Sequence, residues 1–209
     1  RDLEKHYQKG IGIRVGPALE ISKGIYDKGS GKIGVTWGGL ADFIVSPSLS
    51  VETGLKYAHR VYDISDKGEL AEEQLPGMDQ TMGTLKKIDI DSWIFEIPLS
   101  LKYRYPVSIK THWLAGLGYS SQIYGKQVFE YEYGMDGNPD VSINSGYESS
   151  HAHVYSGAFN FSLGVSNQLK NKKILETSIF YQHGLGKIGL ERNTINFLGV
   201  RGTYWFTIR

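Results

Sequence analysis

Several features that would place a chain in a familiar class are missing from these 209 residues. There is no cysteine, which excludes disulfides. The formal net charge is only +1, so there is no general electrostatic case for binding nucleic acid. No window approaches the roughly 18 consecutive apolar residues of a transmembrane helix. Helical periodicity of apolar residues is convincing nowhere, and this leaves β-structure as the alternative.

The residues that are abundant favour β-structure. The chain has 26 glycines and 14 tyrosines, which together suggest closely packed backbones and aromatic rings at an interface. The mean hydropathy is low, at −0.29, yet this does not exclude a membrane. A membrane-spanning β-strand needs only about 9–11 residues, and half of them can be polar.

Strict alternation of apolar and polar residues recurs through the chain, most clearly in "WIFEIPLSLKYRY". Trp93, Ile97 and Leu101 fall on one side of this segment, while Glu96 and Lys102 fall on the other. A period of two marks a β-strand whose faces differ in polarity. Eight segments alternate in this way: 11–22, 33–45, 49–61, 93–105, 109–123, 154–168, 174–183 and 195–208.

The connections between these segments alternate in length. "SPS", "PVS" and "LKNKK" are short, whereas the predicted loops 63–91 and 124–152 are long. Short turns at one end and long loops at the other indicate an up-and-down barrel with two unlike ends. We therefore predict an all-β, eight-stranded antiparallel up-and-down transmembrane β-barrel over residues 11–209, preceded by a linker or periplasmic segment over 1–10.

The sizes of the residues predict which face lies inside. The interior of an eight-stranded barrel is just wide enough for side chains to fill, and bulky residues dominate the apolar face here. The other face combines many glycines with charges of both signs that can pair across a narrow lumen. We expect Leu99 and Leu101 to face lipid. The charges expected in the lumen are Arg14, Glu20, Asp42, Glu52, Lys56, Glu96, Lys102, Arg104, Glu176 and Arg201.

Three segments resemble strands of a known family. "IFEIPLSLKYRYP", "HWLAGLGYSSQI" and "FLGVRGTYWFTIR" are similar to strands of the porin-like outer-membrane β-barrel proteins common in Bacteroidetes, of the small eight-stranded type. Strands of that family often end on an aromatic residue, whereas this chain ends on Arg209. The resemblance implies the fold and an outer-membrane location, and the family has no shared catalytic residues to carry over.

Candidate sites were weighed against ordinary surface positions. His151 and His153 share a strand face, and with one of the nearby acids they could bind a metal, although two histidines at this spacing are a weak signal. The nearby acids are Asp136, Asp140 and Glu148. A separate hypothesis, hydrolase chemistry at the rim, would draw on His59, His183, Ser149 and Ser150. "GSGKIG" at 29–34 lacks the spacing of a phosphate-binding loop.

We therefore predict no catalytic residue, no metal and no cofactor. The expected role is a structural, anchoring or interaction module of the envelope of a Gram-negative bacterium, in its outer membrane, with both termini periplasmic. The alternatives are a narrow channel for small solutes or ions and, less favoured, a rim hydrolase. The expected partners are the lipid bilayer and other envelope proteins, contacted through loops 63–91 and 124–152 or through an upstream segment, with no nucleic acid.

Overall fold

The computed structural model describes residues 12–25, 29–64, 84–135, 138–149, 154–169, 173–185 and 196–208. These residues form strands joined by turns, and no helix in them is long and apolar enough to cross a membrane. The strands are β1 (Gly12–Ile25), β2 (Gly29–Gly31), β3 (Ile33–Ile44), β4 (Leu49–Ile64), β5 (Thr84–Pro106), β6 (Thr111–Met135), β7 (Asn138–Ser149), β8 (Val154–Gln168), β9 (Ile174–Gly184) and β10 (Asn196–Ile208).

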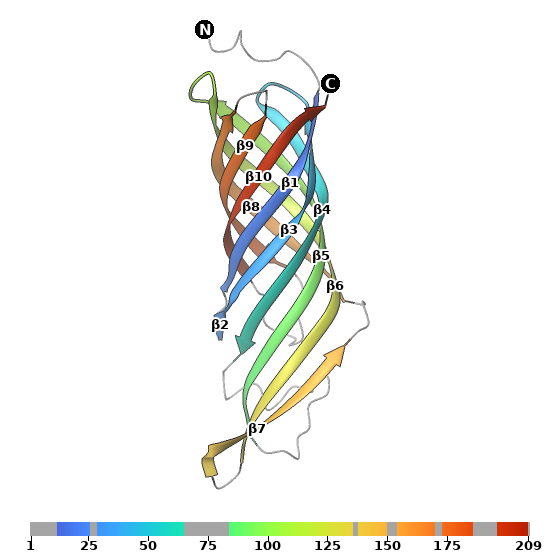
Figure 1. The fold of residues 1–209 in the computed structure, drawn as a ribbon, viewed down its shortest axis with the longest axis vertical. Helices are drawn as coiled ribbons and strands as arrows, with labels where there is room; N and C mark the ends of the chain where they lie inside the picture. The colour runs from blue at the N-terminus through green and yellow to red at the C-terminus, as the bar shows by residue number, and fades with distance from the viewer. Residues whose placement is uncertain are drawn as a thin grey trace.

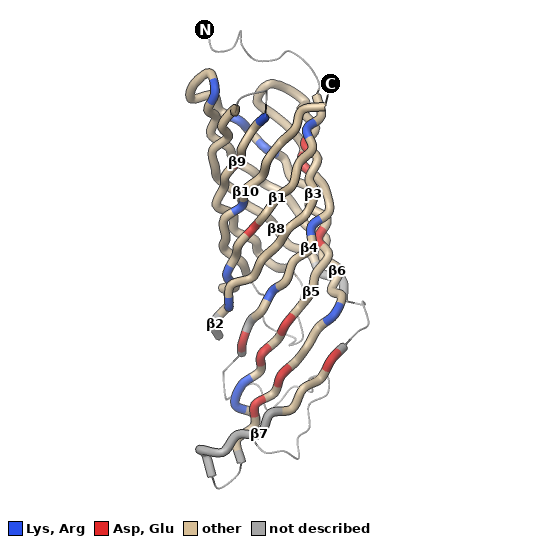
Figure 2. The backbone as a smooth tube through the Cα atoms, viewed as in Figure 1, with Lys and Arg blue, Asp and Glu red and all other residues tan. Residues whose placement is uncertain are grey.

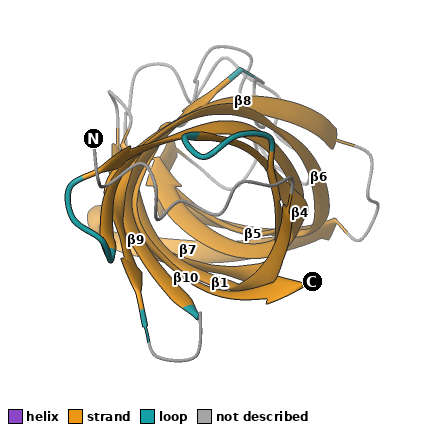
Figure 3. Ribbon diagram, turned by 90° about the horizontal axis from the view of Figure 1, so that it is seen from above, coloured by secondary structure: helices purple, strands orange, loops and turns teal. Residues whose placement is uncertain are grey.

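Eight of these strands close into a ring (Figures 1 and 3). Each pairs antiparallel with its neighbours in the order β1, β3, β4, β5, β6, β8, β9 and β10, and β10 pairs back with β1. The closure leaves no free edge in the barrel wall, as a membrane requires. The eight predicted strands and the up-and-down topology are confirmed.

The alternation of the sequence becomes an alternation between lumen and outer surface. On β5, the outward-facing Ile97 and Leu99 are 46% and 58% exposed, whereas the inward-facing Glu96 and Lys102 are 0% and 6% exposed. The same rule holds around the ring, so that the large exposed side chains are apolar and most of the buried ones are charged or polar. A water-soluble barrel has the opposite arrangement, so this is a transmembrane barrel, as predicted.

Inward-facing glycines make the narrow lumen possible. A Cβ on Gly38 would lie 2.6 Å from the Cα of Lys56, and one on Gly118 would lie 2.7 Å from the Cα of Ser100. Real side-chain carbons do not approach other atoms so closely, so both positions exclude any larger residue. These glycines allow the backbones of the neighbouring strands to approach closely.

Long loops over 63–91 and 124–152 were expected, and this prediction is wrong for the end of the first and for most of the second, while 65–83 lie outside the described residues. Residues 84–91 belong to β5, residues 124–135 belong to β6, and β7 occupies 138–149. Residues 84–92, 125–135 and β7 continue the sheet beyond the ring, and we call them the extension (Figure 1). Apolar and polar residues alternate in the β5 and β6 parts of the extension too, but the apolar residues lie mainly on the inner face and the polar ones mainly on the outer face, which is the reverse of the barrel.

The reversal is visible within β5 alone. Outward positions are apolar up to Trp93 and then become Asp91 and Asp89, while inward positions change from Glu96 to Ile94 and Ile90. Ile90 and Ile94 are 0% and 1% exposed, whereas Asp89 and Asp91 are partly exposed. An apolar interior beneath a charged exterior is the pattern of a sheet in water. The extension therefore lies outside the bilayer, and the bilayer surface crosses β5 near Trp93.

An irregularity in strand pairing keeps the two faces aligned through this change. Between Ser92 and Ile94 the register of β5 with β6 shifts by one residue. Tyr124 and Phe129 of β6 lie five positions apart, so strict alternation would put them on opposite faces, yet both are buried, at 1% and 2% exposure. A β-bulge has this effect, because its extra residue returns the following side chains to the original face.

Both ends of the strand series lie at the end of the barrel opposite the extension. Ile13 of β1 pairs with Ile208 of β10, and Gly12 pairs with Ile44 just before the turn at 45–48. The turn at 107–110 is at the same end (Figure 1). Residues 1–11, which include the predicted linker, lie outside the described residues.

The lipid-facing assignment predicts the effect of a charge at mid-membrane. Leu99 lies six residues from Trp93 and six from Tyr105 along β5, with its side chain exposed. Leu99→Arg is expected to lower the free energy of unfolding by about 2–4 kcal/mol, because an arginine there must enter hydrocarbon. Urea unfolding from lipid vesicles, followed by tryptophan fluorescence, measures this difference.

The matched control is Val128→Arg, since Val128 faces outward on the extension and pairs with Asp91. An arginine there meets water and acids, and the expected change is within about 0.5 kcal/mol. Equal losses in the two variants would contradict the position of the bilayer.

Candidate functional site

Charged side chains fill the lumen and form one connected row, which we call the lumen ion-pair network. Cations and anions alternate along it, and each contacts the next within 4.0 Å. The row contains every charge predicted for the lumen, together with one further arginine from the same face of β4. In order, its members are Arg14, Asp42, Arg104, Glu176, Lys102, Glu52, Arg201, Glu20, Lys56, Glu96 and Arg60.

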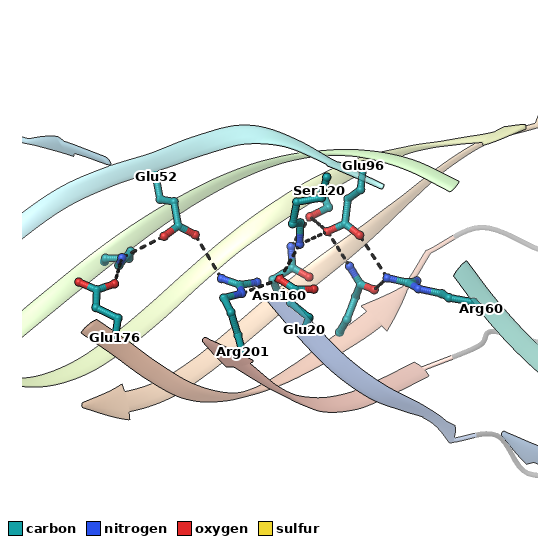
Figure 4. A network of polar contacts seen from close by, with 11 residues as sticks. Glu20, Glu52, Arg60, Glu96, Ser120, Asn160, Glu176 and Arg201 are labelled. Atoms are coloured by element: carbon teal, nitrogen blue, oxygen red, sulfur yellow. Dashed lines mark hydrogen bonds and ion pairs between the residues drawn. The ribbon is translucent and has the colours of Figure 1, made fainter. Parts of the chain in front are cut away.

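The middle of the network bridges opposite walls of the barrel (Figure 4). Lys102 Nζ of β5 lies 2.9 Å from Glu52 of β4 and 2.5 Å from Glu176 of β9. Arg201 of β10 lies 3.2 Å from Glu52 and 2.6 Å from Glu20 of β1. Both cations therefore connect strands that are not adjacent, and both are largely shielded from water.

Glu96 is the most heavily bonded carboxylate near the extension. Its oxygens lie 2.8 Å from Lys56 Nζ and 3.1 Å from Arg60 Nη2, and it is 0% exposed. The Ser120 hydroxyl donates to it at 2.7 Å and the Gln182 amide at 3.1 Å. Two cations and two neutral donors replace the water that this carboxylate has lost.

Three aromatic rings share the lumen with the charges. The guanidinium carbon of Arg60 lies 4.0 Å from the ring centre of Phe197, and Lys102 Nζ lies 4.8 Å from that of Trp205. Arg201 lies 5.4 Å from the ring of Phe180. Bulky rings were expected on the lipid face, so these are exceptions, and each contacts a cation of the network.

Little empty space remains among these side chains. A cavity lined by Glu52, Lys102, Glu176, Arg201 and neighbouring small residues has a volume of about 20 Å³. This is enough for about one water molecule. At this level side chains fill the lumen.

The extension carries a second group of charges (Figure 2), among them Asp89, whose side chain is 26% exposed. Asp89 lies 3.0 Å from Lys32 and 2.7 Å from Lys87, and it pairs across the strands with Asp63 and Glu130. Partial burial raises the pKa of Asp89, but the hydrogen bonds from the two lysines outweigh it and leave the pKa below its usual value. Glu130 is exposed, so the extension presents acids to solvent.

The histidines proposed for rim chemistry are not assembled into a catalytic set in the described residues. His59 Nε2 lies 2.7 Å from Asp91 Oδ1, and its ring stacks on Trp93 with centres 4.2 Å apart. No serine hydroxyl among the described residues bonds to it. His183 stacks on Tyr181. Both histidines therefore face outward and lie against aromatic side chains.

The candidate metal ligands fall mostly where the structure gives no description. Asp136, Ser150, His151 and His153 lie outside the described residues, while Asp140, Glu148 and Ser149 belong to β7. Among the described residues, no group of three or more histidines, aspartates or glutamates could hold a metal ion. The glycines of "GSGKIG" lie in β2 and β3, where strand pairing uses the backbone that a phosphate would need.

Solved structures of other proteins share this architecture. Neisserial surface protein A aligns with 95% of this chain and 100% of its own, at a TM-score of 0.51 and 16% identity. The outer membrane protein OprG from Pseudomonas aeruginosa aligns over 98% and 99%, at a TM-score of 0.50 and 12% identity. The fold is therefore that of the small outer-membrane β-barrels. No family model and no curated protein sequence matches the chain.

Some members of the site were not singled out from the sequence. Ser120, Asn160 and Gln182 stood on the polar faces of their strands without a role, although they complete the bonding around Glu96. A neutral residue on a lumen face gives no signal of its own. Its partner depends on which strands meet across the barrel.

Removing the charge of one network carboxylate should be costly. Glu96→Gln keeps the shape but leaves Lys56 and Arg60 without their shared anion, and we expect a loss of about 3–5 kcal/mol in unfolding free energy. The control Asp89→Asn breaks exposed pairs and should cost about 0–1 kcal/mol. Denaturant unfolding of the folded barrel measures both, and similar values would show that the network does not hold the lumen.

Proposed function

We propose that this protein is an integral outer-membrane barrel that does not conduct, and that it presents the extension to partners outside the membrane as an interaction module of the cell envelope. Membership of the porin-like family of Bacteroidetes is part of the proposal, supported by the three resembling segments. The observation that carries the proposal is the reversal of polarity on β5. This reversal divides the strand into a part of the barrel wall that faces lipid and a part of the extension that faces water.

The filled lumen supports the structural part of the proposal. Cations such as Lys102 and Arg201 reach across the barrel to strands on the far side, and the cavity beside them holds about one water. A continuous water path for solutes would require several of these pairs to separate in a medium of low dielectric constant.

The extension supports the interaction part. It adds a third strand, β7, alongside β6, and its outward face carries Asp89, Asp91 and the exposed Glu130. Tyr147 of β7 is 38% exposed. An exposed aromatic ring beside acidic groups suits contact with a protein surface of complementary charge.

The orientation follows from the unlike ends of the barrel. Short turns in outer-membrane barrels are periplasmic, and longer segments are extracellular. The turns at 45–48 and 107–110 and the ends of β1 and β10 share one end, opposite the extension. These unlike ends support our proposal that both termini are periplasmic and that the extension lies at the cell surface.

Conductance in a planar bilayer tests the closed lumen. The folded protein is expected to give no steps above background, with a heat-dependent shift in gel migration as the check of folding. Reproducible steps that change in Glu96→Gln would favour a narrow channel for small solutes or ions in place of the plug.

Photocrosslinking in cells tests the extension. A photoreactive residue at Glu130 is expected to give protein adducts, because it lies on the charged outward face beyond the bilayer. The same residue at Leu99 is the control and should react with lipid only. Failure of the Glu130 position to yield any protein adduct, in a barrel that reaches the outer membrane, would contradict an interaction role for this face.

A further inference from the structure

The lumen ion-pair network is not neutral. It contains six cations and five carboxylates, which leaves one positive charge (6 − 5 = 1). Every carboxylate of the network contacts two of its cations, whereas Arg60 contacts a single carboxylate, that of Glu96. The side chain of Arg14 is 16% exposed and can be hydrated, but that of Arg60 is only 2% exposed. The charge imbalance therefore matters most at Arg60.

Hydrogen-bond donors are also in excess at this end of the lumen. Arg60 Nη2 donates to Glu96 at 3.1 Å and to Gln182 at 2.7 Å. Its Nε and Nη1 atoms are buried and have no acceptor among the described residues, and the same holds for Nε2 of Gln122, a residue that pairs across the strands with Glu96. An arginine nitrogen can only donate, so these groups call for an acceptor.

The surroundings of Arg60 are largely apolar on one side. The ring of Phe197 covers a face of the guanidinium at 4.0 Å, while the N–H groups lie in the guanidinium plane. Phe197 belongs to a buried apolar cluster that includes Ala58, Ile94 and Tyr124. Attraction between a cation and an anion is much stronger in such surroundings than in water.

We propose that Arg60 binds a small monovalent anion of the halide class, with the Gln122 amide as a further donor. One such ion would balance the sixth cation and accept the remaining N–H groups. A water molecule could accept these bonds but would leave the charge unbalanced. A dianion such as sulfate would overcompensate the charge in a narrow lumen. This site does not rest on the interaction role proposed above.

Halide-dependent stability of the full, folded chain tests the site. The folding equilibrium is measured in sodium chloride and in sodium gluconate of equal ionic strength. Once chloride exceeds its dissociation constant, each tenfold increase should raise the folding equilibrium constant about tenfold, which is the dependence for one bound ion. Arg60→Gln should remove this dependence, and the surface control Lys32→Gln should keep it.

Bromide gives a second measurement that does not depend on the variant folding. Crystals of the unaltered protein grown in sodium bromide should show an anomalous peak within hydrogen-bond distance of Arg60 Nε or Nη1. A peak there supports the site even if Arg60→Gln fails to fold. Chloride dependence that persists in Arg60→Gln, or a site occupied by water without an anomalous peak, would overturn the proposal.

Discussion

Buried charges must find partners, and this constraint governs the barrel. The lumen of eight strands is too narrow to keep its carboxylates and cations hydrated, and the surrounding lipid offers no alternative. Each interior member of the lumen ion-pair network therefore contacts two groups of opposite sign, as Lys102 contacts Glu52 and Glu176. Inward glycines such as Gly38 and Gly118 allow the neighbouring strands to pack closely around this lumen.

The same constraint explains where the membrane part of the chain ends. Beyond Trp93 the outside of the sheet meets water, so outward positions become Asp91 and Asp89 and inward positions become isoleucine. The chain continues the same strands through both environments and exchanges only the chemistry of their faces. The lumen network ends at Arg60, whose cross-strand neighbour Ser92 marks this change on β5. The anion proposed at Arg60 would therefore lie where the polar lumen meets an apolar core.

The sequence predicted the barrel well because its strands alternate strictly and bulky residues cannot fit inside eight strands. All eight barrel strands and the ten charges assigned to the lumen were correct. The extension was missed, since residues 84–91 and 124–135 reverse the polarity on which the membrane interpretation relied. β7 was missed as well, because its segment is rich in Asn, Gly and Ser, which are typical of loops.

The period of two in the sequence specifies which side chains point inward, because it assigns alternate residues to opposite faces of a strand. The inward positions also show that charges of both signs are present to pair. The choice of partner, in contrast, depends on tertiary structure: Lys102 and Glu176 lie 74 positions apart, and Arg201 and Glu20 lie 181 apart. Ring closure and the stagger of the strands set which inward residues share a level, and no local pattern in the chain encodes that stagger.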